Sequence, residues 1–137
     1  MATARKPAKR RQRFSFVRFD PGKFKRGGLR SSFSYRDLGI RRATAGMAGA
    51  HVIRAEDLRP GGKAGGTGRH SHTLDFQMVY VLKGKVTFWY AGRGRIAMGP
   101  GDCVYQPPGI RHELIDWSRD MELLEITMPA EFETQAG

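Results

Sequence analysis

Two histidines one residue apart open the segment HSHTLDFQMVYVLKG, residues 70–84. Successive residues of a strand point to opposite faces, so we expect His70 and His72 to lie on one face, close enough to share an ion. Gln77 comes five residues after His72, which gives it the wrong parity on one unbroken strand. It can rejoin the histidines only if the chain turns or bulges in between, where Asp75 is a favourable turn residue.

Any further donor to such an ion must come from elsewhere in the chain, which has two more histidines. His112 follows GDCVYQPPGIR, which we interpret as a strand, a Pro-Pro-Gly turn and the start of the next strand. His51, in AGAHVIRAE, has no partner at ligand spacing, and we expect a structural or surface role. Two or three imidazoles with an oxygen donor suit Fe, Mn, Ni, Cu or Zn, and glutamine can supply an amide oxygen. The residues therefore predict a site for one divalent transition metal and leave its identity open.

Short β-like runs separated by Gly, Pro and Asp make up the chain from Ser31 onward. The predicted strands cover residues 32–38, 41–47, 50–57, 69–74, 76–84, 85–91, 94–99, 102–108, 112–118 and 121–129. The clearest hairpin is VYVLKGKVTFWY, in which two apolar and aromatic arms flank Gly84. Many short strands with frequent turns predict an all-β sandwich or barrel, and 137 residues suffice for one domain.

The positive charge is concentrated at the start of the chain. Residues 1–30 contain eleven Lys and Arg against one acid, Asp20, whereas residues 31–137 contain thirteen basic and twelve acidic residues. The stretch ATARKPAKRRQRF has no apolar periodicity, so we predict a disordered basic arm over residues 1–13. The simplest interpretation is a solubilising tail. The alternatives are contact with nucleic acid, anionic lipid or an acidic partner, or an organelle transit peptide, and the body itself offers nucleic acid no basic surface.

No segment indicates insertion into a membrane. No apolar run approaches the roughly 18 residues that span a bilayer, and no charged-then-apolar signal opens the chain. The single cysteine, Cys103, cannot form an internal disulfide, and we expect a buried, inert thiol. We therefore predict a cytoplasmic protein without membrane contact.

Two stretches resemble the two motifs of the cupin superfamily. GDCVYQPPGIRH has the spaced Gly, Pro, Gly and His of the second motif, and HSHTLDFQMVYVLKG has the first motif's two histidines and its glycine at the hairpin turn. The resemblance covers roughly residues 64–116. The chain departs from the motifs in three places: Gln77 stands where the family has Glu, Asp116 where it has Asn, and Ala64 where it has Gly.

The resemblance implies a small single-domain cupin, a jelly-roll β-barrel with one divalent metal at its mouth. The implied ligands are His70, His72, Gln77 and His112; alternatively, Gln77 hydrogen-bonds a metal-bound water. We expect the arm (1–13) to be followed by N-terminal strands (14–60), a conserved barrel core (61–128) and a C-terminal tail (129–137). The strands before residue 60 could pair with or exchange into a second copy, so we predict a homodimer.

The substitution of Gln for Glu bears on the chemistry. It leaves the site more positive by one unit, which favours anionic ligands, and it removes a carboxylate base. The ligand set is similar to that of small cupins that open unsaturated uronate sugars. We therefore expect a metal-dependent enzyme for a small polar or anionic substrate, of dioxygenase, isomerase or ring-opening type, although no certain acid or base is visible. The alternatives are a non-catalytic module that binds a small ligand or metal, and a basic-armed protein whose barrel is only a scaffold.

Overall fold

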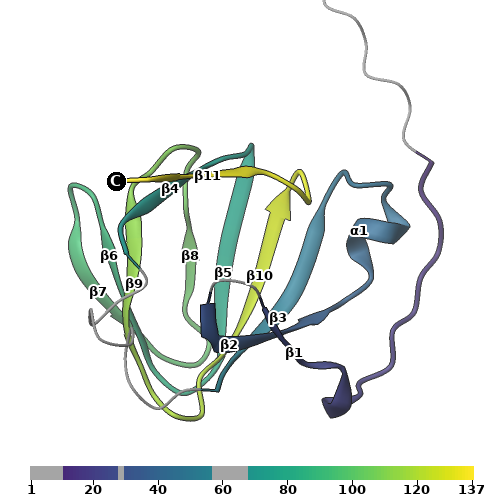
Figure 1. The fold of residues 1–137 in the computed structure, drawn as a ribbon, viewed down its shortest axis with the longest axis horizontal. Helices are drawn as coiled ribbons and strands as arrows, with labels where there is room; N and C mark the ends of the chain where they lie inside the picture. The colour runs from purple at the N-terminus through teal and green to yellow at the C-terminus, as the bar shows by residue number, and fades with distance from the viewer. Residues whose placement is uncertain (1–10, 28–29, 57–67) are drawn as a thin grey trace, which may run out of the picture.

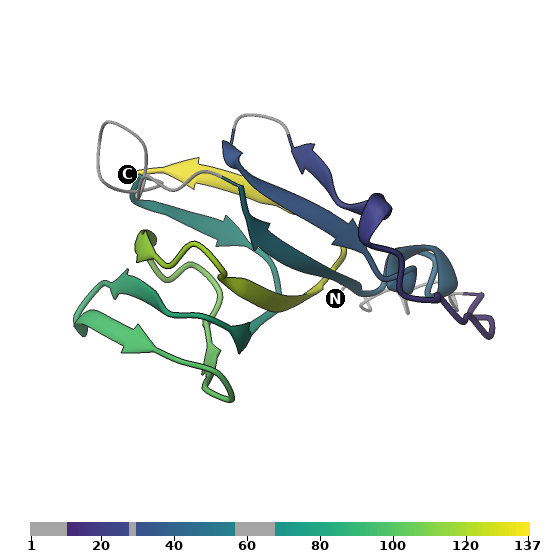
Figure 2. The same ribbon diagram turned by 90° about the horizontal axis from the view of Figure 1, so that it is seen from below.

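The computed structural model describes residues 11–27, 30–56 and 68–137, which form two antiparallel sheets packed face to face (Figures 1 and 2). From edge to edge, the six-stranded sheet consists of β1 (Lys25–Gly27), β2 (Arg30–Asp37), β3 (Gly49–Ala55), β10 (Glu122–Met128), β5 (Phe76–Lys83) and β8 (Cys103–Tyr105). The five-stranded sheet consists of β11 (Glu133–Ala136), β4 (His70–Thr73), β9 (His112–Trp117), β6 (Val86–Tyr90) and β7 (Gly94–Met98). Two short helical segments, η1 (Pro21–Lys23) and α1 (Ile40–Ala43), complete the described chain. The prediction of an all-β jelly-roll barrel is confirmed.

Alternation of apolar and polar residues explains how the two sheets enclose a core. In β6, Val86, Phe88 and Tyr90 point inward and are buried, while the residues between them are partly exposed. Val79 and Val81 of β5 are buried in the same way from the opposite sheet. Each such side chain contributes about 1.5–3 kcal/mol by leaving water, so the alternation fixes which face of each strand lies inside.

The hairpin between β5 and β6 depends on Gly84. Its φ of +73° lies in the left-handed region, and a Cβ at this position would lie 2.9 Å from the Cα of Met121. Only glycine meets both requirements, which is why the predicted hairpin turns here.

The predicted strand over residues 41–47 is wrong, because this stretch forms α1 and a turn. The backbone is left-handed at Ala45 and Gly46, which an extended strand cannot accommodate. The Thr44 hydroxyl donates to the Ile40 carbonyl and accepts from the Ala48 amide, so the local hydrogen bonds favour a turn.

Two strands were not predicted, β1 and β11. β11 lies in the segment expected to be a tail and pairs antiparallel with β4, with Thr134 opposite His72. Its sequence, ETQA, has no apolar alternation and is exposed throughout, so only pairing with β4 defines it as a strand.

The described end of the basic arm lies against the barrel. Residues 11–20 belong to no helix or strand and run beside α1, on the side of the molecule opposite β8 (Figure 1). The backbone N–H of Arg13 donates to the Ala43 carbonyl at 2.9 Å. Residues 1–10, the rest of the predicted disordered arm, lie outside the described residues, as do 57–67. Neither helical segment of the described chain is long and apolar enough to cross a membrane.

Candidate metal centre

Three of the four histidines meet inside the barrel. His70 and His72 lie on one face of β4, and His112 begins β9, where it stands opposite His70 in the sheet register. One nitrogen of each ring lies within 4.8 Å of those of the other two. The expectation that His70 and His72 share a face with room for an ion is therefore confirmed.

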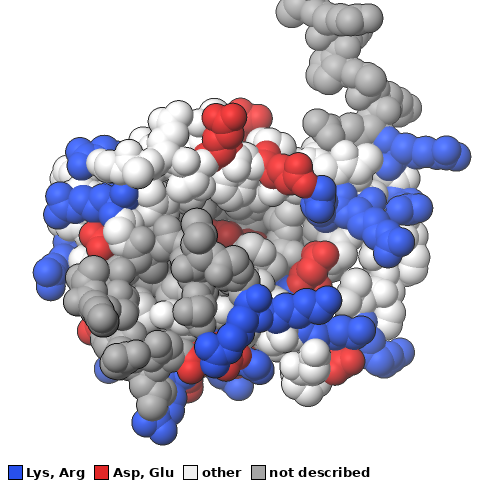
Figure 3. Space-filling model, viewed as in Figure 1, with Lys and Arg blue, Asp and Glu red and all other residues white. Residues whose placement is uncertain are grey.

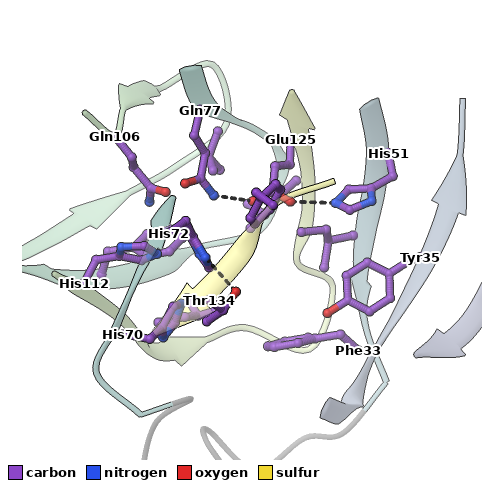
Figure 4. A pocket seen from close by; sticks show the side chains of 16 residues that line it. Phe33, Tyr35, His51, His70, His72, Gln77, Gln106, His112, Glu125 and Thr134 are labelled. Atoms are coloured by element: carbon purple, nitrogen blue, oxygen red, sulfur yellow. Dashed lines mark hydrogen bonds and ion pairs between the residues drawn. The ribbon is translucent and has the colours of Figure 1, made fainter. Parts of the chain in front are cut away.

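Hydrogen bonds on the outer side of each ring orient the cluster. Nδ1 of His70 lies 2.7 Å from the Gly68 carbonyl, and Nδ1 of His112 lies 3.0 Å from the Ile110 carbonyl. Because a carbonyl can only accept, these Nδ1 atoms carry the proton and the lone pair resides on Nε2. Nδ1 of His72 contacts the Thr134 hydroxyl at 2.9 Å (Figure 4). Metal-ligating histidines are held in this way, so the three residues fit a divalent transition metal.

Gln77 reaches the same cavity through the predicted turn. The chain bends at Asp75 between β4 and β5 and passes from one sheet to the other, which points Gln77 inward. Its amide nitrogen donates to Oε2 of Glu125 at 2.9 Å, so the amide oxygen is the atom left for other partners (Figure 4). Metal ligation by Gln77 stays a prediction.

A partly buried carboxylate faces the histidines from the opposite sheet. Oε1 of Glu125, on β10, lies 2.6 Å from Nε2 of His51. Oε2 of the same carboxylate accepts a hydrogen bond from the Gln77 amide nitrogen (Figure 4). Burial by itself would raise the pKa of the Glu125 carboxyl, but His51, with contributions from Gln77 and His72, holds it below its ordinary value. Glu125 is therefore an ionised group inside the cavity.

The sequence analysis missed Glu125 and assigned His51 a structural or surface role. His51 stands outside the three-histidine cluster, yet it lines the cavity as the partner of Glu125. A signal was present in the alternation of β10: Glu125 shares the inward face with Leu123 and Thr127, both buried. A carboxylate at an inward position needs partners, which the strand's own sequence does not identify.

The cavity has a volume of about 400 Å³ and is lined by both polar and apolar side chains. It is lined by Phe33, Tyr35, His51, Ile53, His70, His72, Gln77, Val79, Phe88, Gln106, His112, Leu114, Leu123, Glu125, Phe132 and Thr134. Gln106 is only 1% exposed; its amide nitrogen donates to the Tyr90 hydroxyl at 2.6 Å, but its oxygen has no hydrogen-bond partner among the described residues. Figure 4 shows the Gln106 amide beside that of Gln77, on the side of the cavity where the histidines lie.

Arg69, Arg111 and Cys103 face away from the cavity. The Arg69 guanidinium stacks 3.8 Å above the Trp89 ring, and its Nε lies 3.8 Å from Glu113. Arg111 donates to the Gly137 carbonyl. Cys103 is exposed on β8, so the expectation of a buried thiol is wrong: in this three-residue strand Val104, not Cys103, packs against the core.

Residues 55–127, more than half of the chain, match the sequence model of the cupin domain family. The chain belongs to the cupin family. Comparison with curated proteins gave no match.

Solved structures share the fold of this cupin at low identity. RemF, a polyketide cyclase from Streptomyces resistomycificus, superposes with a TM-score of 0.68 at 19% identity, over 89% of this chain and 85% of its own. Pac13, a nucleoside dehydratase from Streptomyces, gives 0.59 at 14%, over 90% and 95% of the two chains. FeII HppE gives 0.61 at 12%, over 82% and 60%. At these identities the likeness establishes the fold alone.

Proposed function

We propose that this cupin is a metal-dependent enzyme that transfers a proton within a small polar or anionic substrate, in an isomerase or ring-opening reaction. The observation that carries the proposal is the position of Glu125, an ionised carboxylate in the same cavity as the three-histidine cluster. The family's usual carboxylate position is occupied by the neutral Gln77, so Glu125 supplies the base that the motif itself lacks.

His70, His72 and His112 would hold the metal, with Gln77 as the candidate fourth donor. When bound, a divalent ion held by neutral imidazole and amide groups keeps its full charge and acts as a Lewis acid toward a substrate oxygen. The hydrogen bonds of the rings to the carbonyls of Gly68 and Ile110 and to the Thr134 hydroxyl fix the ring orientations before any ion arrives.

Glu125 is arranged to accept and return a proton. Each of its oxygens has one hydrogen-bond partner, His51 on Oε1 and Gln77 on Oε2, which leaves a further lone pair on each oxygen. The carboxylate takes a proton from one substrate atom, is held in place by both partners, and returns the proton to another atom. The reaction consumes no oxidant and needs no second substrate.

The residues that line the cavity limit the size and the polarity of the substrate. The unpartnered oxygen of Gln106 is buried, and such acceptors cost about 1–3 kcal/mol unless a donor meets them. A substrate O–H or N–H at this point would satisfy it. Phe33, Phe132 and Leu114 contribute apolar surface to the lining of the cavity. We infer a compact, oxygen-bearing molecule that also carries apolar groups, of a size that about 400 Å³ admits. RemF and Pac13, whose names specify a cyclase and a nucleoside dehydratase, are enzymes with the same fold.

Deuterium exchange against a panel of candidate substrates tests the proposal. The metal-loaded protein is incubated in D₂O with uronates, hydroxy ketones and enolisable phenolic ketones, and deuterium incorporation is followed by NMR. We expect incorporation into at least one compound, reduced by about 100-fold or more in Glu125→Gln. Glu122→Gln is the matched control, because Glu122 lies on the same strand but pairs with Lys83 outside the cavity.

Two results would contradict the proposal. Exchange that persists unchanged in Glu125→Gln would exclude this carboxylate as the base. Saturable binding of panel compounds without exchange would instead favour the non-catalytic binding module.

A further inference from the structure

A second pocket lies between the N-terminal segment and β2. It has a volume of about 560 Å³, which falls within the roughly 300–1,000 Å³ that small-molecule sites occupy. Residues 17–25 and β2 line it, with the side chains of Val17, Arg18, Phe19, Asp20, Lys23, Lys25, Tyr35, Arg36 and Asp37. Tyr35 is the only one of these that also lines the cavity of the three histidines. The pocket therefore has its own chemistry, separate from that of the candidate metal centre.

Positive charge predominates in this pocket. Four cations and two acids leave a net charge of +2, from Arg18, Lys23, Lys25 and Arg36 against Asp20 and Asp37. Each aspartate accepts a backbone N–H at 2.9 Å, that of Gly22 for Asp20 and that of Gly39 for Asp37. None of the four cations forms an ion pair with another residue that the structure describes. Figure 3 shows Lys and Arg side chains on the side of the molecule where Figure 1 places η1 and β1.

Arg36 is held in place without a counter-charge. Its guanidinium lies 5.1 Å from the ring centroid of Phe19 and 5.7 Å from that of Phe24. Its Nε is buried and has no hydrogen-bond partner within the described chain. Arg54 also stacks on Phe24, at 4.0 Å, but pairs with Glu56 at 2.8 Å. Because a half-buried charge without a partner costs free energy, an anion that enters the pocket gains from meeting Arg36.

The charge and the shape of the pocket indicate the class of anion. A phosphate monoester carries about −1.5 to −2 at pH 7 and three acceptor oxygens, which matches the net charge of +2, whereas one carboxylate would neutralise only half of it. Arginine and lysine are the usual donors to phosphate. Val17, Phe19 and Tyr35 add apolar and aromatic surface, which a bare phosphate would leave uncovered.

We propose that this pocket binds a small phosphorylated molecule, a phosphate monoester with an aromatic or apolar group. The phosphate lies against Lys23, Lys25 and Arg36, and the ring or apolar group lies against Phe19 and Tyr35. The site is additional to the proposed enzymatic function, because neither the metal nor Glu125 takes part in the binding.

Three probes separate the contributions of charge and of apolar surface. Phenyl phosphate, inorganic phosphate and phenol are each titrated into the zinc-loaded protein, and backbone amide shifts are followed by NMR. We expect saturable binding of phenyl phosphate, about tenfold tighter than that of inorganic phosphate or phenol, with the shifts centred on residues 17–25 and 35–37. The affinity should fall as salt is added, because screening weakens the attraction between the pocket and the phosphate.

Two variants test the residues of the pocket. Lys23→Ala/Lys25→Ala removes two exposed cations and should weaken phenyl phosphate binding by about tenfold or more. Arg93→Ala/Arg95→Ala is the matched control, because it removes two exposed cations beside β6, on the other sheet, and should leave the affinity unchanged. Phe19→Ala should lower the affinity for phenyl phosphate toward that for inorganic phosphate. Circular dichroism establishes that each variant is folded.

Several results would overturn the proposal. Absence of saturable binding, or shifts confined to the neighbourhood of His70, His72 and His112, would place no phosphate in this pocket. An equal loss of affinity in the Arg93→Ala/Arg95→Ala control would show attraction to the overall charge of the chain rather than to a site. Phenol that binds as tightly as phenyl phosphate would exclude recognition of the phosphate. Each of these results leaves the proposed proton transfer as it stands, because that reaction is measured by deuterium exchange.

Discussion

The two walls of the cavity are built by different principles. On the five-stranded sheet, His70 and His72 come from one strand, and the spacing that brings them together is visible in three consecutive residues. On the six-stranded sheet, Glu125 meets His51 and Gln77 only because β10 lies between β3 and β5. The wall that would hold the metal is thus a local motif, His70 and His72, completed by His112. The wall that contains Glu125 results from the order of the strands in the sheet. Motif reasoning finds the first kind of site and misses the second.

The largest expected effect separates the histidines from Gln77. His112→Ala should weaken metal affinity by about 100-fold or more, because imidazole is a strong donor to borderline metals. Gln77→Ala should weaken it by less than about tenfold, because water can replace an amide oxygen. Elemental analysis and competition with a chelator measure both, with His51→Ala as the control histidine of the same cavity. If Gln77→Ala loses as much metal as His112→Ala, the metal centre spans both walls.

An intermediate effect is expected when the family's carboxylate is restored. Gln77→Glu removes the amide that donates to Glu125 and places a second carboxylate where the two groups now lie 2.9 Å apart. Without metal, the repulsion should destabilise the fold by about 1–3 kcal/mol, measured by urea unfolding. With metal, the new carboxylate ligand should raise the affinity for the metal by about tenfold. The rate of proton transfer should fall because the site loses positive charge. Unchanged stability without metal would show that the two walls do not interact through Gln77.

The smallest expected effect concerns a carboxylate at the rim of the same sheet. Glu56 accepts hydrogen bonds from Ser34 at 2.6 Å and from Arg54, and these hold the pKa of its carboxyl below the ordinary value. A lowered folded pKa means that the stabilisation is present above the unfolded pKa of about 4.3 and is lost as pH falls through the folded pKa. Glu56→Gln should therefore cost about 0.5 kcal/mol at pH 7, and the difference from wild type should shrink as pH falls through the folded pKa of Glu56. A difference in urea unfolding that does not shrink as the Glu56 carboxyl becomes protonated would assign the loss to packing rather than to charge.

Predictions from the sequence were wrong where local hydrogen bonds or pairing between strands outweighed the pattern of apolar residues. The stretch after Ile40 has β-like composition, yet the Thr44 hydroxyl and two left-handed residues produce a turn. β11 has no apolar pattern and exists because β4 offers it a partner. Cys103 lies in a predicted strand, where a buried thiol is the default, but β8 is short and places it on the outer face.

By itself the sequence determined the strands with alternating apolar residues, the hairpin at Gly84 and the histidines of both motifs, because each depends on neighbours within a few residues. Tertiary structure alone decided that Glu125, 74 positions from His51, would be its partner and that Gln77 would donate to it. The physical reason is that period-two alternation fixes which face a side chain occupies but not which strand lies beside it. Strand order in a jelly-roll is set by packing of the whole core, and the chemistry of the second wall follows from that order.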